Sequence, residues 1–437
     1  MTNLSRVLTF RDLVLITIGN VIGSGIFIVP AGVLAATKGD LGLASVVWVC
    51  GGILTLLGAF TYAELGAMKP DAGGLYSYLR DAFGGFLAFL YGWALFAVIG
   101  AATMAGLAVA FTNYLGEFVT LPPAANKAVA VAVIVVICVI NVRGTRESAD
   151  VLNWSTLIKA VAIVVMSLFL FAAGTQLGPS PKFVVPLDAK MMVGIGAAMI
   201  PVLWAYEGWH YVTFSAGEAT DPQRDFGRAI VAGTVVLVVL YLLASVAYVA
   251  ALGTEKGSMS PRIAAEAVST LFGSAAGKLI AAAILVSMYS AAHATALTSP
   301  RAFFAMARDG VFFQKLAEVH PRWGTPAFAI IVMCAIAAAL AIVGGFDELI
   351  GYVVVTGWTF YALGAASLFW YRARQPDAPR PFRTPLYPLT PALFVIGAGG
   401  LVINQLINDT KNALVGFGIT LLGVPVYLFW RWKRTRG

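Results

Sequence analysis

Twelve long apolar segments follow one another along this chain of 437 residues, and they limit the folds that it can adopt. They lie near residues 13–37, 42–67, 85–115, 126–142, 152–174, 191–215, 228–252, 276–300, 326–344, 348–371, 389–407 and 412–431. About 20 apolar residues carry a helix across the hydrocarbon core of a bilayer. Backbone polar groups in that core need partners within the protein, and helices supply them. We therefore predict an all-α integral membrane protein with twelve transmembrane helices.

Composition agrees with a membrane protein and gives no sign of an enzyme. Charged residues make up 11% of the chain, whereas soluble domains carry about 25%. The three histidines, at positions 210, 293 and 320, show no metal-ligand spacing, and the sequence contains no phosphate-binding P-loop. The sequence therefore predicts no enzyme, no metal and no cofactor.

The basic residues follow the membrane rather than a nucleic-acid surface. If the N-terminus is cytoplasmic, the segments on that side hold twenty of the 29 Lys and Arg residues, and those on the other side hold eight. Basic residues concentrate in the cytoplasmic loops of membrane proteins. The net charge of +8 therefore does not indicate nucleic-acid binding. We expect a multi-pass protein of the inner (cytoplasmic) membrane, with the lipid bilayer around it and both termini in the cytoplasm.

Glycines and a proline interrupt the first apolar segment. Gly19, Gly23, Gly25 and Pro30 lie close together there, and such residues weaken a helix. Non-helical backbone at membrane depth occurs where it is buried in protein or lines a watery cavity. Its freed N–H groups can then bind an anion. The alternative is that the glycines only let helices pack closely.

A second interruption lies five spans later. Pro201, Glu207 and Gly208 fall within the sixth apolar segment. Two interrupted spans at corresponding positions indicate a transporter built from inverted repeats. Within a single domain, 1–435, residues 10–174 would form the first five-helix repeat and 190–371 the inverted second. Residues 388–432 would add helices 11 and 12.

Three ionisable residues lie at membrane depth, where function is the default hypothesis. Lys159 either reaches the headgroups with its ammonium or faces the bundle as a fixed charge or proton carrier. Glu207 either meets substrate or protons in a cavity or satisfies nearby backbone donors. His293 is either a packing histidine or a group with a role in the pocket or in proton transfer.

Four motifs, in order, resemble the amino acid–polyamine–organocation superfamily. They are GNVIGSGIF at 19–27, WAYEGW at 204–209, GEATDPQRD at 217–225 and AMARDG at 305–310. Within that superfamily the chain is similar to bacterial L-type amino-acid transporters. The resemblance covers residues from about 10 to 435. It implies a twelve-helix protein that carries L-amino acids, usually by exchange.

The resemblance also implies a substrate site. The substrate carboxylate would bind backbone N–H groups of Ser24, Gly25 and Ile26. The amino group would bind backbone carbonyls, which correspond to Val21, Ile22, Trp204, Ala205 and Glu207. The substrate side chain would meet Val21, Ile26, Trp204 and Thr295. Such an arrangement favours neutral amino acids of small to medium size.

Lys159 corresponds to a lysine of the sodium-independent members, which bridges the first and eighth spans. Its expected partners are Gly19 and either Ser287 or Ser290. Two positions depart from the family pattern: His293 stands where asparagine is common, and Glu207 where Asp, Gly, Ser or Ala often occurs.

We therefore expect sodium-independent exchange of L-amino acids, and the alternative is a proton-coupled symporter. Eukaryotic relatives pair with a glycoprotein through a cysteine in the second external loop. Residues 116–127 contain no cysteine, so no disulfide-linked heavy subunit is expected.

Overall fold

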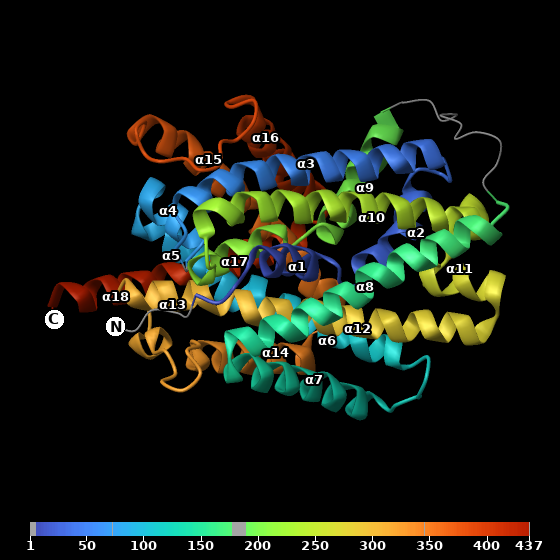
Figure 1. The fold of residues 1–437 in the computed structure, drawn as a ribbon, viewed down its shortest axis with the longest axis horizontal. Helices are drawn as coiled ribbons and strands as arrows, with labels where there is room; N and C mark the ends of the chain where they lie inside the picture. The colour runs from blue at the N-terminus through green and yellow to red at the C-terminus, as the bar shows by residue number, and fades with distance from the viewer. Residues whose placement is uncertain (1–5, 72, 177–188, 345, 437) are drawn as a thin grey trace.

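The protein is a bundle of helices in a computed structural model that describes residues 6–71, 73–176, 189–344 and 346–436. Most helices run along the long axis of the molecule in Figure 1. The N-terminus and the C-terminus lie at the same end of the bundle. This end is called the terminal end below, and the other is called the distal end.

The helices of the first half coincide with the first five predicted spans. The spans are formed by α1 (Phe10–Val21) with α2 (Gly25–Ala36), then α3 (Leu41–Met68), then α5 (Gly85–Ala94) with the π-helical η1 (Leu95–Ile99) and α6 (Gly100–Leu115), then α7 (Pro123–Arg143) and α8 (Thr145–Ala173). A short helix, α4 (Leu75–Phe83), lies in the loop between α3 and α5.

The second half follows the other predicted segments. They correspond to α9 (Ala189–Ala205) with the 3-10 helix η2 (Trp209–Glu218), α10 (Pro222–Met259), α12 (Ser274–Thr298), α14 (Ala327–Val343), α15 (Phe346–Arg374), α16 (Leu389–Asn408), and α17 (Thr410–Leu421) with α18 (Gly423–Arg436). Three short elements lie in the connections: α11 (Ile263–Phe272), α13 (Pro300–Arg308) and η3 (Gln314–Ala317).

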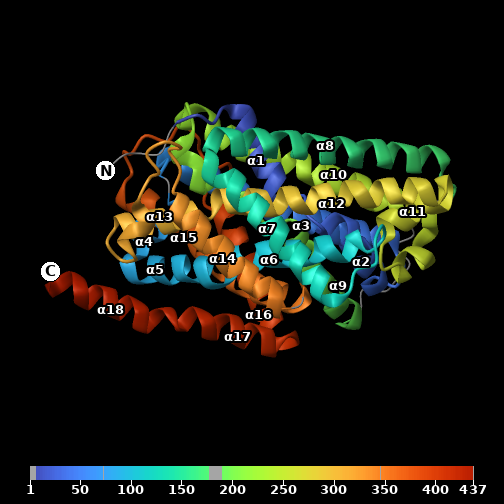
Figure 2. The ribbon, with the colours of Figure 1, turned by 90° about the horizontal axis from the view of Figure 1, so that it is seen from below.

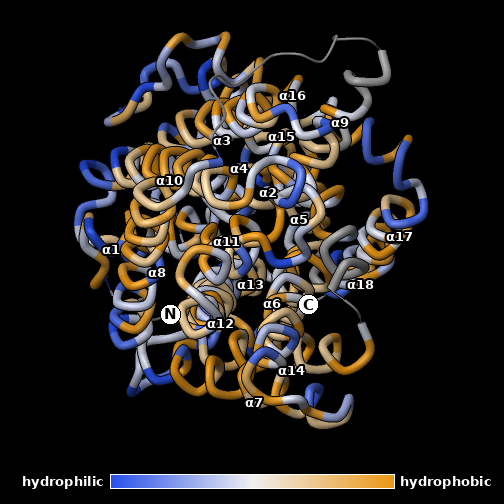
Figure 3. The backbone as a smooth tube through the Cα atoms, turned by 90° about the vertical axis from the view of Figure 1, so that its right-hand side faces the viewer, coloured by the Kyte–Doolittle hydropathy of each residue, from blue (hydrophilic) through white to orange (hydrophobic). Residues whose placement is uncertain are grey.

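The described helices have the length and composition of a multi-pass membrane protein. Nine are long and apolar enough to cross a bilayer, and α1 with α2 makes a tenth span that bends by 47° at its break. The shorter α14 has 17 residues. Apolar residues run along the helices in Figure 3, and hydrophilic residues gather in the connections. These observations confirm the prediction of an all-α fold with many helices long enough to span a membrane.

Local sequence signals explain where several helices begin. Thr9 and Asp12 form a capping box before α1, and Asp40 accepts a hydrogen bond from the N–H of Leu43 at the start of α3. Asp221 does the same for Arg224 at the start of α10. Such caps satisfy N–H groups that have no partner within the helix. The start of α2 has no such cap.

The last two helices lie at the edge of the bundle. Figure 2 shows α17 and α18 as one long helical rod along the outside, ending at the C-terminus. The rod contacts α5 and α15 on one side. The other helices of the bundle pack around the two interrupted spans.

Candidate functional site

The first span is interrupted where its glycines predicted a break. Helix α1 ends at Val21, and Ile22 has an extended backbone with ψ 90°. Helix α2 begins at Gly25, where Ser24 makes no side-chain cap and its buried hydroxyl has no partner among the described residues. The first N–H groups of a helix have no acceptor within it. The start of α2 is therefore an uncapped, positively polarised helix end inside the protein.

The second interruption faces the first. Helix α9 ends at Ala205, and Gly208 takes a left-handed conformation with φ 109° before η2 begins. A Cβ atom on Gly25 would lie 2.8 Å from the Cα of Ala205, and one on Gly208 would lie 2.8 Å from the carbonyl oxygen of Asn20. Both glycines are therefore required by close approach of the two backbones.

A cavity of about 40 Å³ lies between the two breaks. Its wall includes seven of the predicted site residues: Val21, Ser24, Gly25, Trp204, Ala205, Glu207 and Thr295. Ile22 and Ile26 are not part of the wall, although both belong to the first break. With this volume, the cavity has room for only a few water-sized spheres in this conformation.

Sequence reasoning missed part of this wall. Asn20, Thr103, Gly106, Leu107, Tyr211 and Ala291 also line the cavity. Asn20 and Tyr211 lie within or beside the two motifs that predicted the breaks. By contrast, Thr103, Gly106 and Leu107 belong to α6, to which neither of the two interrupted spans points.

Lys159 lies behind the first break and does not line the cavity. Its ammonium donates hydrogen bonds to the carbonyl oxygens of Gly19, at 2.9 Å, and Ile22, at 2.5 Å. The side chain is 1% exposed, so it does not reach the headgroups. The C-terminal end of a helix carries partial negative charge. Lys159 therefore neutralises the end of α1 from within α8.

The two serines of α12 have different partners. The hydroxyl of Ser287 donates to the carbonyls of Ile22, at 3.1 Å, and Gly23, at 2.9 Å. Ser290 instead accepts a 3.0 Å hydrogen bond from Ser155. Of the two alternatives, Ser287 shares an acceptor with Lys159 and Ser290 does not. The carbonyl of Ile22 thus joins α1, α8 and α12.

The carbonyls of the first break are already engaged in this conformation, which the resemblance did not predict. The oxygen of Ile22 accepts from Lys159 and Ser287. The oxygen of Val21 accepts from the N–H of Gly23, at 2.8 Å, and from the hydroxyl of Tyr241, at 3.1 Å. A carbonyl oxygen has two lone pairs. A substrate ammonium would have to share or displace these donors.

Glu207 lies at the cavity wall and is tied to α15. Its Oε1 accepts a 2.5 Å hydrogen bond from the hydroxyl of Tyr361. Its Oε2 is buried and has no partner among the described residues. Tyr361 also packs on the ring of His210, with centroids 4.0 Å apart. One carboxylate oxygen is therefore fixed, and the other is the natural acceptor for a proton or a ligand.

His293 faces away from the cavity. Its Nε2 lies 2.9 Å from the hydroxyl of Ser148 and 3.0 Å from the Ser148 carbonyl, and its Nδ1 lies 3.2 Å from Nδ2 of Asn141. The Ser148 hydroxyl donates to the Oδ1 of Asn141. The network is complete when His293 is neutral, with Nε2 donating and Nδ1 accepting. The geometry favours the packing interpretation of this residue.

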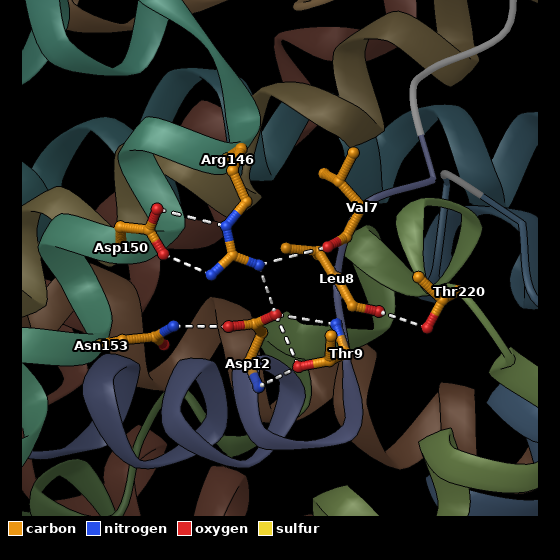
Figure 4. A network of polar contacts seen from close by, with 8 residues as sticks. All are labelled: Val7, Leu8, Thr9, Asp12, Arg146, Asp150, Asn153 and Thr220. Carbon is orange, nitrogen blue, oxygen red and sulfur yellow. Dashed lines mark hydrogen bonds and ion pairs between the residues drawn. The ribbon is translucent and has the colours of Figure 1, made fainter.

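At the terminal end, the segment before α1 runs beside the segment after η2. The N–H groups of Val7 and Leu8 donate to the carbonyl of Glu218, at 2.9 and 3.0 Å, and the N–H of Thr220 donates to the carbonyl of Leu8 at 2.9 Å. Figure 4 shows the part of this contact between Leu8 and Thr220, next to Arg146 of α8. These hydrogen bonds join the first and sixth predicted spans on the terminal side of the cavity.

Arg146 extends the same contact to α8. Figure 4 shows its guanidinium between Asp150 and Asp12, and the distance to Asp12 is 2.9 Å. Asp12 also accepts a 2.5 Å hydrogen bond from Asn153. Asp12 is 2% exposed, so removing one partner would leave a buried charge uncompensated. The start of α1 is therefore fixed against α8.

A fully buried ion pair closes the terminal end further. Arg301 donates to Glu218 at 2.8 Å, and both side chains are 0% exposed. The hydroxyl of Thr145 donates to the same carboxylate at 2.8 Å. Glu218 thus holds the N-terminal segment with its backbone and holds α8 and α13 with its side chain.

A separate polar cluster ties α4 to α13. Arg80 lies 2.6 Å from Asp309, and the hydroxyl of Tyr76 donates to Asp309 at 2.9 Å. Burial, with the nearby charge of Asp309, raises the pKa of Tyr76 well above its usual value. Tyr76 therefore stays protonated and acts as a donor.

The distal side of the site is more open. A cavity of about 520 Å³ is lined by α2, α9, the end of α10, α15 and α16. Trp204 belongs to the walls of both this cavity and the central one. The described parts of the chain thus place ion pairs and backbone contacts on one side of the central cavity, and on the other a large cavity beyond Trp204.

Fold and site together define a class: polytopic helical membrane proteins in which two discontinuous spans meet at a central cavity, the arrangement of many secondary transporters. The amino acid permease family model matches residues 8–429. The chain therefore belongs to the amino acid permease family, within the amino acid–polyamine–organocation superfamily that its motifs indicated.

The chain is similar to proteins named as exchangers and transporters. The serine/threonine exchanger SteT of Bacillus subtilis is 32% identical over 415 residues, which is 94% of each chain. The human large neutral amino acids transporter small subunit 2 is 31% identical over 429 residues, covering 96% of this chain and 79% of that protein. The human cystine/glutamate transporter is 30% identical over 440 residues, covering 99% and 86%.

Proposed function

We propose that this protein carries L-amino acids across the cell membrane by sodium-independent exchange, and that its substrates are neutral and of small to medium size. The observation that carries the proposal is the uncapped start of α2, which faces the second break across a small cavity. N–H groups of Ser24, Gly25 and Ile26 would bind the substrate carboxylate. Relatives named as exchangers support amino-acid exchange.

Carbonyls near the breaks would bind the substrate ammonium. Trp204, Ala205 and Glu207 are the main acceptors in this proposal, because the carbonyls of Val21 and Ile22 already accept two donors each. The small cavity, whose mostly apolar wall includes Thr103 and Thr295, fits a short side chain. Sodium independence rests on Lys159, whose ammonium occupies carbonyl oxygens that could otherwise coordinate a cation.

In this proposal the protein has twelve transmembrane spans. Ten are the spans described above, α9 with η2 forms another, and α14 forms the last. Residues 10–174 and 190–371 form the two inverted repeats, and 388–432 form the two added helices. The protein would lie in the inner membrane of the cell. Its terminal end would face the cytoplasm, because twenty of the 29 basic residues fall on that side. Since residues 116–127 lack cysteine, we expect no disulfide-linked partner.

The test is uptake of radiolabelled alanine, serine or leucine into proteoliposomes that contain the purified protein. We expect uptake when unlabelled amino acid is present inside, and the same rate when choline replaces sodium on both sides. Equal uptake into empty vesicles would contradict obligatory exchange. A thermal-stability screen with the twenty amino acids identifies the substrate, since a ligand at 100 times its Kd adds about 2.7 kcal/mol.

A proton-coupled symporter is the second candidate, and the position of Glu207 favours it. Glu207 lines the cavity, one oxygen of its carboxylate is held by Tyr361, and the other is buried without a partner among the described residues. A pH-sensitive dye inside the vesicles separates the two functions. Symport acidifies the interior when substrate is added outside, whereas exchange of neutral amino acids leaves the internal pH unchanged.

A further inference from the structure

The end of α18 carries a run of positively charged residues. Basic residues at 431, 433, 434 and 436 follow one another, and no acidic residue occurs after Asp409. Arg431 and Lys433 are exposed, and no ion pair involves them in the part of the chain that the structure describes. We call residues 431, 433, 434 and 436 the C-terminal basic segment.

Six basic side chains elsewhere at the terminal end have acidic partners. The pairs are Lys69 with Asp81, Arg80 with Asp309, Arg146 with Asp12, Arg301 with Glu218, and Arg372 and Arg380 with Glu64. Arg431 and Lys433 differ from these six residues, because neither has an acidic partner among the described residues. Charge complementarity calls for an anionic partner from outside the chain.

The position of this segment along α18 places it at the level of lipid headgroups. Leu428 and Phe429, just before it, are 55% and 54% exposed, as expected for side chains among acyl chains. A helix rises about 1.5 Å per residue, so Arg431 lies roughly 4 Å and Arg436 roughly 12 Å beyond Leu428. The headgroup layer is about 5–8 Å thick on each side of the hydrocarbon core. The charges therefore begin within that layer.

Aromatic contacts hold the segment at this depth. The ring of Trp430 lies 5.2 Å from that of Phe313, in the loop after α13, and the ammonium of Lys433 lies 5.3 Å over the Trp430 ring. Trp432 is 52% exposed. Indole rings favour the membrane interface. Figure 2 shows α18 along the edge of the bundle, with its end extending beyond the other helices.

We propose that the C-terminal basic segment is a binding site for the headgroups of anionic phospholipids in the leaflet at the terminal end. The phosphate groups would accept hydrogen bonds from the guanidinium and ammonium groups. Each Lys or Arg near an anionic membrane surface contributes about 1 kcal/mol, or roughly a fivefold change in affinity. The proposal does not depend on what the central cavity carries.

Native mass spectrometry of the purified full-length protein tests this site. Phosphatidylglycerol and phosphatidylcholine with the same acyl chains are titrated in parallel, and retained lipid is counted. We expect preferential retention of phosphatidylglycerol, and a drop of about tenfold or more in the variant Arg431→Gln, Lys433→Gln, Arg434→Gln, Arg436→Gln. The double variant Arg434→Gln, Arg436→Gln should show an intermediate loss.

The matched control removes the same charge at the distal end, from the exposed lysines in Lys127→Gln, Lys256→Gln, Lys278→Gln, Lys411→Gln. This variant should retain phosphatidylglycerol like the unmodified protein. Salt near 1 M, where the screening length falls to about 3 Å, should abolish the preference. Equal retention of both lipids, an equal loss in the control, or displacement by millimolar inorganic phosphate would each overturn the proposal.

Discussion

Lys159 is a cation held by backbone oxygens rather than by a carboxylate. Its contacts with Gly19 and Ile22 satisfy carbonyls that the break in the first span leaves without helical partners. Ser287 adds a third donor to the same place from α12. A movement of α1 against α8 or α12 would have to break and remake these hydrogen bonds. We therefore propose that Lys159 controls the rate of the transport cycle.

We predict that Lys159→Ala leaves the protein folded and able to bind substrate but slows exchange by about tenfold or more. Leaving buried carbonyls without a partner costs about 1–3 kcal/mol for each group, and 1.36 kcal/mol in a barrier is a factor of ten. Lys159→Arg should not restore the rate, because a planar guanidinium does not fit a site shaped for an ammonium. Initial exchange rates in proteoliposomes measure this, with Lys278→Ala as the control at an exposed position. An unchanged rate in Lys159→Ala would refute the role.

The sequence predicted that Lys159, Glu207 and His293 lie within membrane spans, but it did not predict which residues they contact. A lysine in an apolar span is compatible with a headgroup contact or a buried contact, and only the fold places Lys159 against α1. His293 was ambiguous for the same reason. Its neutral network with Ser148 and Asn141 depends on how α7, α8 and α12 meet. Sequence spacing within one helix does not contain that information.

At the scale of elements, the two breaks act as a unit because their backbones touch. Gly25 has no room for a side chain against Ala205. In the same helix, a Cβ on Gly32 would meet no atom within 4 Å. The helix thus contains a tightly constrained glycine and an unconstrained one, seven residues apart, which provides a matched pair for substitution.

We expect Gly25→Ala to abolish substrate-induced thermal stabilisation and exchange, because the added methyl group would lie 2.8 Å from the Cα of Ala205 and would push α2 away from α9. Overpacking of this kind costs about 1–3 kcal/mol. Gly32→Ala should keep both properties and slightly raise the melting temperature, since alanine favours a helix more than glycine does. If both variants bind substrate alike, contact between the breaks is not needed for the site.

The apolar segments predicted the helices well because membrane burial leaves few alternatives to helix. Glycines and prolines predicted both breaks, since they act on local backbone conformation. The α6 side of the cavity was not predicted, because Thr103 and Leu107 look like ordinary span residues until α6 is packed against the breaks. The engaged carbonyls of Val21 and Ile22 were missed because their donors come from distant helices.

At the scale of the whole molecule, the contacts around the central cavity are asymmetric. Toward the terminal end, Glu218 joins the N-terminal segment, α8 and α13 through its backbone and its carboxylate. Toward the distal end, the large cavity beyond Trp204 is lined by α2 and α9. If the proposed exchange proceeds by alternating access, we expect the contact of Leu8 with Ala219 and Thr220 to open in each cycle.

A disulfide across that contact is expected to stop transport. Leu8 and Ala219 form a parallel bridge, and bridged residues lie about 4.7–4.9 Å apart, within the Cα range of about 4.4–6.8 Å that disulfides need. In a background lacking Cys50, Cys138 and Cys334, oxidation of Leu8→Cys/Ala219→Cys should abolish exchange, and a reductant should restore it. Each single cysteine variant serves as a control and should be insensitive to oxidant. Full exchange by protein whose disulfide is verified by mass spectrometry would mean that the substrate leaves without separating the N-terminal segment from the end of η2.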